Sequence, residues 1–185
     1  MKSKRILTIA TAAVALVALG GAAISAQDKY NLKVPGGLAF SEFRGYENWE
    51  VVNIAHTDDL LKVIVGNSVA MEAYRAGVPG NGKPFPNGAK LAKVEWKKVQ
   101  SPDAPYEIKV PGAIYDLDFM VKDSKRFADG NGWGYAVFVW DAASNGYKPG
   151  TLNHVPPQAN DAKCGVACHT IAKGKDQVFT TYAGR

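Results

Sequence analysis

The chain of 185 residues has the size of a single domain that can close its own hydrophobic core. Its composition, 46% hydrophobic and 21% charged residues, excludes a disordered or fibrous protein. The formal net charge of +5 is modest, and part of it comes from three basic residues among the first five positions.

The N-terminal segment, residues 1–26, has the layout of an export signal. Its basic start precedes an uncharged run that ends in small residues at Ala26. We expect cleavage near residues 23–26, although the run, about 20 residues long, is also long enough to stay as an uncut membrane anchor. Without this segment, 19 basic residues face 17 acidic ones, so the charge falls to +2 and no nucleic-acid partner is expected. The sequence thus predicts a periplasmic protein with one functional domain, residues 27–185.

Five segments of that domain have the patterns of β-strands. Some alternate apolar and polar residues, others are rich in aromatic and β-branched residues, and turn residues bound each one. We expect strands at residues 49–54, 60–65, 91–99, 114–121 and 133–140. The fold class predicted from this pattern is mainly β (α+β).

Two short helices and two irregular segments are expected between and after the strands. Residues 67–77 begin with Asn67, a capping residue, and end at a glycine, and a second short helix is expected at residues 122–128. Residues 79–88 are rich in proline and glycine, which predicts a long loop of the kind that often lines a site. Residues 147–158 are expected to be an irregular connection.

The segment KCGVACHT, residues 163–170, holds both cysteines of the chain and one of its three histidines. Covalent attachment of haem c commonly uses Cys-x-x-Cys-His, in which two thiols bond to the porphyrin and the histidine binds the iron. Here Cys164 and Cys168 are separated by three residues, and His169 follows directly. We expect Gly165 to accommodate the extra residue because glycine adopts backbone angles that other residues avoid.

Two other interpretations of this segment remain open from the residues alone. In an exported protein, two cysteines four positions apart on a helix, about 6 Å between Cα atoms, are within reach of a disulfide. That pairing gives no reason for the adjacent histidine. A zinc site would need His56 or His154 as a further ligand, and nothing in the sequence brings either close.

The segments around this motif resemble the cytochrome P-460 family. The likeness runs from about Gly45 to Tyr182 and includes residues 119–127, 132–136, 167–170 and 176–180. That family contains periplasmic mono-haem proteins built on an antiparallel sheet with a few helices, among them hydroxylamine-oxidising enzymes and β-sheet cytochromes c-prime that bind nitric oxide. The resemblance implies that Cys164 and Cys168 form thioethers to haem c and that His169 is the proximal iron ligand.

The resemblance also implies groups on the other side of the haem. In the oxidising members a lysine is bonded to the porphyrin edge, and its position falls on Lys93, which is otherwise an ordinary solvated strand lysine. A distal arginine of those enzymes maps near Lys62, which can replace it only as a point charge. A distal carboxylate that removes protons maps to Asp161, which is otherwise the N-cap of the haem-bearing turn.

An open sixth position on the iron separates a catalyst or gas binder from an electron carrier. Met71 and Met120 lie in segments whose spacing indicates packing, so neither is expected to bind the iron. Three aromatic residues are candidates to cap an apolar distal pocket, namely Phe40, Phe43 and Phe85. The prediction is therefore a five-coordinate haem.

Taken with the resemblance, the sequence predicts a mono-haem c-type cytochrome that oxidises hydroxylamine or processes small nitrogen oxides, with Lys93 and Asp161 as candidate catalytic residues. A redox partner cytochrome would take the electrons in that case. Alternatives are a protein that binds nitric oxide or carbon monoxide without turnover, an electron-transfer cytochrome, and a haem-free β-domain with a disulfide. The oligomeric state is left open, a homodimer included.

Overall fold

The computed structural model describes residues 28–34, 37–150 and 165–184. The predicted export segment and Asp161, Cys164 and His154 lie outside these residues. None of the helices in the described part of the chain is long and apolar enough to span a membrane.

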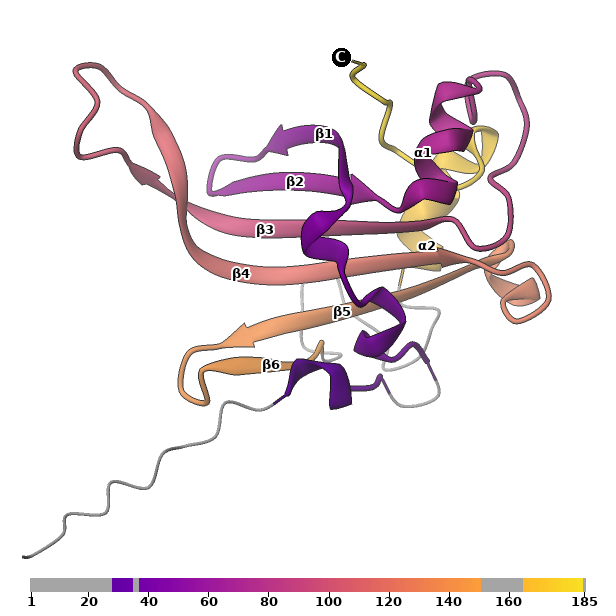
Figure 1. Ribbon diagram of the computed structural model, residues 1–185, viewed down its shortest axis with the longest axis horizontal. Helices are drawn as coiled ribbons and strands as arrows, with labels where there is room; N and C mark the ends of the chain where they lie inside the picture. Colours follow the sequence, from indigo (N-terminus) through magenta and orange to yellow (C-terminus); the bar gives the residue numbers. More distant parts are fainter. Residues whose placement is uncertain (1–27, 35–36, 151–164, 185) are drawn as a thin grey trace, which may run out of the picture.

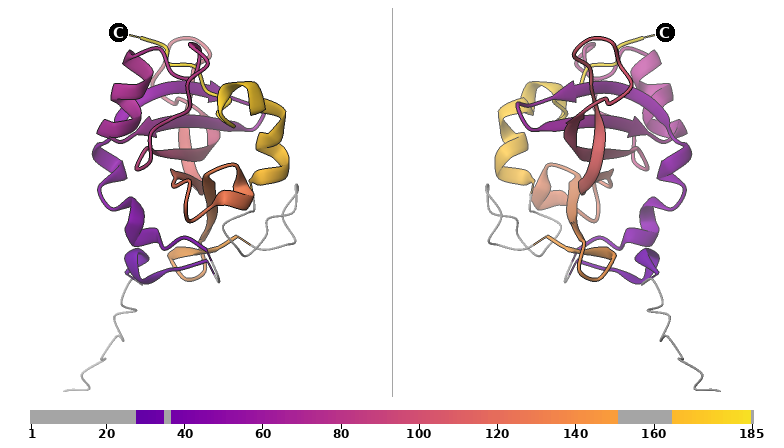
Figure 2. Two further views of the ribbon diagram at one scale, coloured as in Figure 1. Left: turned by 90° about the vertical axis from the view of Figure 1, so that its right-hand side faces the viewer. Right: turned by 90° about the vertical axis from the view of Figure 1, so that its left-hand side faces the viewer.

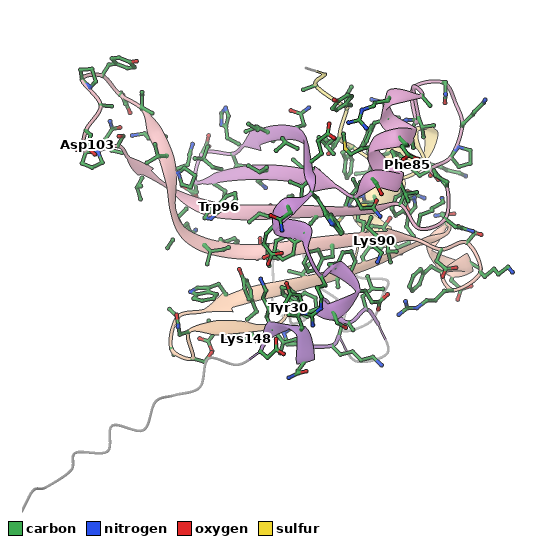
Figure 3. The ribbon with its side chains drawn as sticks, in the orientation of Figure 1. Tyr30, Phe85, Lys90, Trp96, Asp103 and Lys148 are labelled. Carbon is green, nitrogen blue, oxygen red and sulfur yellow. The ribbon has the colours of Figure 1, made fainter. Side chains whose placement is uncertain are left out.

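One antiparallel sheet of six strands organises the molecule (Figure 1), with its strands in the order of the sequence. The strands are β1 (Glu50–His56), β2 (Leu60–Gly66), β3 (Lys90–Gln100), β4 (Lys109–Lys122), β5 (Trp133–Asp141) and β6 (Gly146–Pro149). The hairpin of β3 and β4 extends beyond the other strands, with Asp103 at its tip (Figure 3). The mainly β prediction and its five strands are confirmed.

The helical elements are short. They are the α-helices α1 (Ser68–Arg75) and α2 (Val166–His169), and the 3-10 helices η1 (Lys29–Asn31), η2 (Phe40–Phe43), η3 (Tyr46–Asn48), η4 (Ala128–Gly130) and η5 (Thr170–Lys175). The prediction for α1 is confirmed, because the Asn67 side chain accepts a hydrogen bond from the Ala70 backbone N–H and caps the helix.

Two local predictions are wrong, the second of them over residues 147–149. Residues 122–128 form the end of β4 and a turn instead of a helix, because the Asp123 carboxylate accepts the N–H groups of Lys125 and Arg126 and closes the chain locally. The expected irregular segment at 147–158 begins with strand β6, which pairs with β5 at the edge of the sheet, where its terminal Pro149 is tolerated.

Alternation along the strands gives the sheet two different faces. One face packs against the N-terminal 3-10 helices in a core that includes Phe40, Phe43 and Phe119. The opposite face meets α1, α2 and the residues after α2, with Trp133 at its centre. Figure 2 shows the N-terminal elements and the C-terminal segment on opposite sides of the sheet.

Candidate functional site

A cavity of about 520 Å³ lies between the second face of the sheet and the C-terminal segment. Strands β1 to β5 line its sheet side, and α2 with residues 178–180 lines its C-terminal side. Apolar residues from both sides contribute to the lining, including Ile64, Leu91 and Phe179. Its volume is within the range of pockets that hold cofactors, roughly 300–1,000 Å³.

The register of the strands places charged residues on the sheet side of the cavity. Lys62 of β2 pairs with Glu95 of β3, and Glu95 pairs with Asp116 of β4. Two residues before Glu95 in β3, Lys93 pairs with Asp118 of β4. All five side chains therefore point to the same face, because side chains of adjacent strands in register share a face.

Ion pairs connect most of this charged group. Lys93 Nζ lies 2.7 Å from Glu95 Oε1 and 2.5 Å from Asp118 Oδ2, and Lys62 Nζ lies 3.0 Å from Glu95 Oε1. Burial lowers the pKa of Lys93, but the charges of Asp118 and Glu95 outweigh burial and raise that pKa above its usual value. Lys93 is thus held as a cation in the cavity and is not the ordinary solvated strand lysine.

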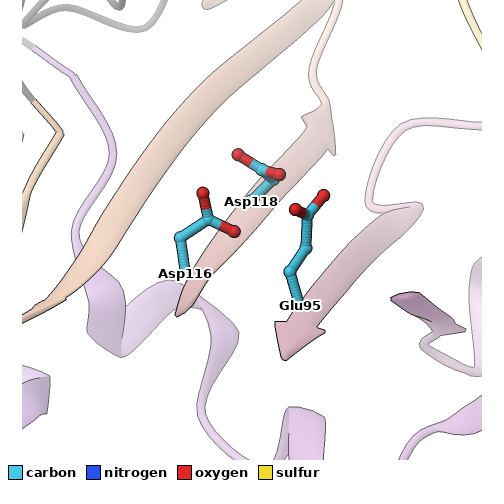
Figure 4. A group of neighbouring side chains, drawn as sticks. All are labelled: Glu95, Asp116 and Asp118. Carbon is cyan, nitrogen blue, oxygen red and sulfur yellow. The ribbon is translucent and has the colours of Figure 1, made fainter. Parts of the chain in front are cut away.

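Three carboxylates converge within the group (Figure 4). One carboxylate oxygen from each of Glu95, Asp116 and Asp118 lies within 4.8 Å of the other two. Burial, and then the negative charges of Asp118 and Glu95, raise the pKa of Asp116 to about 8. Lys62 and Lys93 balance the negative charges of the other two carboxylates, Glu95 and Asp118.

His169, at the end of α2, lies on the C-terminal side of the cavity. Its Nδ1 is 2.6 Å from the carbonyl oxygen of Gln177, so the N–H stands on Nδ1 and donates to that carbonyl, which leaves Nε2 with its lone pair. Burial lowers the pKa of the imidazole, against the opposing effect of the Gln177 carbonyl, and keeps the ring neutral. The ring packs between Tyr135 and Phe179. This is the state of a histidine that binds a metal.

A buried ion pair fixes the turn that carries the Gln177 carbonyl. Asp176 and Gln177 both adopt positive φ, 49° and 66°. Asp176 accepts hydrogen bonds from Lys122 Nζ at 2.6 Å and from the Phe85 backbone N–H at 2.8 Å. Sequence reasoning missed this role of Asp176 and Lys122, since their pairing joins residues 54 positions apart.

Gly165 is required for a different reason from the one predicted. Its φ of −91° and ψ of −10° are open to any residue. A Cβ at this position would lie 2.3 Å from Cδ1 of Tyr135, so glycine lets α2 approach β5 closely. Cys168 lines the cavity and is exposed, as a thiol at its rim.

The other predicted residues divide between the cavity and the core. Lys62, Lys93 and Met120 line the cavity, whereas Met71 is on the buried face of α1 and His56 ends β1. The predicted aromatic cap is absent from the described residues: Phe40, Phe43 and Phe85 are core residues, and no residue of the loop 79–88 lines the cavity.

The described residues fit a haem. A cavity of suitable size has apolar walls, a neutral imidazole with Nε2 available, and a thiol directly before that histidine at its rim. Haem bound there would be held by His169 through Nε2 from the C-terminal side. The lysines and carboxylates of the strands would then be on the other side of the cavity.

Comparison with known proteins agrees with this fit. No curated protein matches the chain. The family model described as cytochrome P460 matches residues 43–180, which is well over half of the chain and includes the whole sheet and His169. The chain therefore belongs to the cytochrome P460 family, and as a family member it is a haem cytochrome.

Proposed function

We propose that this chain is an exported mono-haem c-type cytochrome that oxidises hydroxylamine in the periplasm. Haem c would be held by thioethers from Cys164 and Cys168 and by His169, with the sixth position of the iron open to the substrate. The iron would supply the ligand site and accept electrons, which pass to a redox partner cytochrome.

The observation that carries the proposal is the charged sheet side of the cavity. Hydroxylamine is small, polar and protonatable, so it needs hydrogen-bonding partners when it leaves water. Lys93 and the neighbouring carboxylates supply donors and acceptors on the sheet side of the cavity. A cavity specialised for uncharged diatomic gases would need none of these groups.

Each group of the chain has a distinct task in this proposal. His169 would hold the iron from the C-terminal side. The Gln177 carbonyl accepts the N–H on Nδ1, which leaves the lone pair of Nε2 for the iron. Lys93 would be the lysine bonded to the porphyrin edge, as in oxidising members, and Glu95 and Asp118, which pair with its Nζ, would position it. Asp161 stays a candidate for proton removal and lies outside the described residues.

The test compares Lys93→Arg with Lys148→Arg. Arginine keeps the positive charge next to Glu95 and Asp118 but lacks the primary amine, whereas Lys148 is an exposed residue of β6 outside the cavity. With haem-loaded protein, hydroxylamine and an artificial electron acceptor, we expect turnover to fall at least about tenfold in Lys93→Arg. A lysine bonded to the porphyrin edge changes the optical band of the haem, so we also expect the Soret band of Lys93→Arg to differ from that of the wild type, and Lys148→Arg to behave as the wild type.

Three results would contradict the proposal. A wild-type protein that binds nitric oxide and does not oxidise hydroxylamine is a gas-binding cytochrome. A low-spin, six-coordinate spectrum indicates electron transfer instead. Exported protein without haem, with a mass two hydrogens below that of the reduced chain, indicates a disulfide-containing β-domain.

A further inference from the structure

The C-terminal segment forms the outer side of the second face of the sheet (Figure 2), and its surface beside the cavity is partly apolar. Ile171 is 85% exposed, the highest value among the large hydrophobic residues of the described chain, and Phe179, which packs on the His169 ring, is 52% exposed. Cys168, three residues before Ile171, is exposed at the cavity rim. Single exposed apolar residues are normal, but two beside the rim of one cavity indicate contact with another molecule.

The exposed charges of the same segment are all positive. Lys173 and Lys175 are exposed, and neither forms an ion pair with another described residue. Asp176 is the one acidic residue of the sequence from 165 to 184, and it is engaged by the buried Lys122. Cations near the end of a helix are favourable by themselves, but that effect does not account for the exposure of Ile171. The segment therefore presents apolar side chains together with uncompensated positive charge.

This combination fits the surface of another protein. Interfaces between proteins bury apolar side chains at their centre and place charged residues around them. Complementary charge mainly speeds association, which suits two proteins that meet briefly to exchange an electron. A partner for Lys173 and Lys175 needs acidic side chains. An anionic membrane fits less well, because recognition of anionic lipids uses a larger cluster of basic residues than these two.

The thiol at the rim relates this surface to the haem. Cys168 is one of the two cysteines expected to bond to the porphyrin, so an edge of the haem would lie at the part of the rim next to Ile171 and Phe179. We propose that residues 168–179 are the docking surface for an acidic redox protein that takes up electrons at this edge. The inference rests on the proposed function, in which electrons leave to a redox partner. One electron passes in each encounter, from ferrous iron to the oxidised metal of the partner, and no covalent bond forms or breaks.

Plastocyanin, an acidic copper protein, is a suitable probe for this surface. The haem-loaded protein is reduced with dithionite, and the second-order rate constant of its oxidation by cupric plastocyanin is measured at low and high salt. We expect the wild-type constant to fall about tenfold as salt is added, because salt screens the attraction between the two proteins. The double variant Lys173→Gln with Lys175→Gln should lower the low-salt constant about fivefold and weaken the salt dependence.

Matched variants separate docking from other effects. Lys148→Gln removes an exposed lysine of β6 outside the cavity and should keep the wild-type constant at low and high salt. Ile171→Ser should lower the constant about threefold at both salt concentrations, because its contribution is apolar, whereas Val99→Ser on the β3–β4 hairpin should not. The midpoint potential of the haem should be the same in all variants, so that a slower rate reports weaker docking.

Nuclear magnetic resonance detects the same contact without electron transfer. The isotope-labelled, haem-loaded protein is titrated with cuprous plastocyanin, and we expect amide shifts at residues 168–179 and none in β6. Shifts confined to another surface overturn the proposal, as does a double lysine variant with the wild-type rate constant. Binding to phosphatidylglycerol vesicles that depends on the two lysines, with electron transfer independent of them, would assign the surface to a membrane and also overturn it.

Failure of this proposal is distinguishable from failure of the proposed function. Dithionite supplies the electrons in the docking assay, so the assay does not depend on hydroxylamine. Haem-loaded protein that shows the expected rates and shifts but does not oxidise hydroxylamine contradicts the proposed function alone. Exported protein without haem contradicts both.

Discussion

Nδ1 of His169 donates a hydrogen bond to the carbonyl of Gln177, and residues distant in sequence set the position of that carbonyl. Gln177 follows Asp176, and the Asp176 carboxylate is held by the Lys122 ammonium and the Phe85 backbone N–H. The Lys122 ammonium also lies 5.2 Å from the centre of the Trp133 ring. This buried pair therefore determines how the imidazole faces the cavity.

Replacing one member of the pair should cost more than replacing both. Asp176→Asn leaves the Lys122 ammonium, whose side chain is 8% exposed, without its anion, so we expect a loss of about 3–5 kcal/mol in the free energy of unfolding. Asp176→Asn combined with Lys122→Met should lose less than Asp176→Asn alone, since no uncompensated charge remains. Urea unfolding of the wild type, the two single variants and the double variant measures the coupling. Additive losses would show that the pair is not coupled.

At the scale of elements, the short helix α2 is held close to β5 by contact of Gly165 with Tyr135. Tyr135 also packs on the His169 ring, so the same tyrosine contacts both ends of the helical segment 165–169. A displacement of α2 therefore moves the candidate iron ligand as well.

Gly165→Ala tests this contact. The added Cβ would lie 2.3 Å from the Tyr135 ring, so either the ring or α2 must shift, at a cost of about 1–3 kcal/mol. We expect a lower melting temperature and an altered haem ligand-field spectrum. Gly174→Ala in η5 is the control, because an added Cβ there has nothing within 4 Å and should leave both measurements unchanged. If the two variants behave alike, the close approach of α2 has no role in the site.

The same scale shows what the sequence predicts about the fold. Alternation of Leu117 and Phe119 with Asp116 and Asp118 predicts a strand with two unlike faces, which the structure confirms. Alternation does not specify strand register, and only the register brings Asp116 next to Glu95. The acidic face is consequently recognisable as polar in the sequence, but its burial in a cavity is not.

For the whole molecule, the sheet separates two functions. Its first face packs against the N-terminal 3-10 helices in an aromatic core, where Phe43 and Phe119 stack at 4.1 Å between ring centroids. That core supports a rigid second face, on which polar residues can be kept at fixed distances. Phe40 and Phe43 could not be assigned to this core from sequence, because the N-terminal segment pairs with the sheet only through tertiary packing.

The candidate site, like the fold, was predictable from the sequence only in part. The Cys-x-x-x-Cys-His segment identifies His169, and the family resemblance identifies Lys93, which the structure brings to the same cavity from a different element. Asp176 and Lys122 were not predictable as its support, since a turn with positive φ and a long-range ion pair leave no periodic pattern in the chain. Cys164 and Asp161 keep their predicted roles as predictions.

The central claim is that His169 binds haem iron in the cavity between the sheet and the C-terminal segment. Resonance Raman spectroscopy of the ferrous, haem-loaded protein tests it most directly, because a five-coordinate haem with a histidine ligand has an iron–histidine stretching band. We predict this band in the wild type, its loss in His169→Gly, and its return when imidazole is added to the variant. A band that persists in His169→Gly, or a six-coordinate spectrum of the wild type, would contradict the claim.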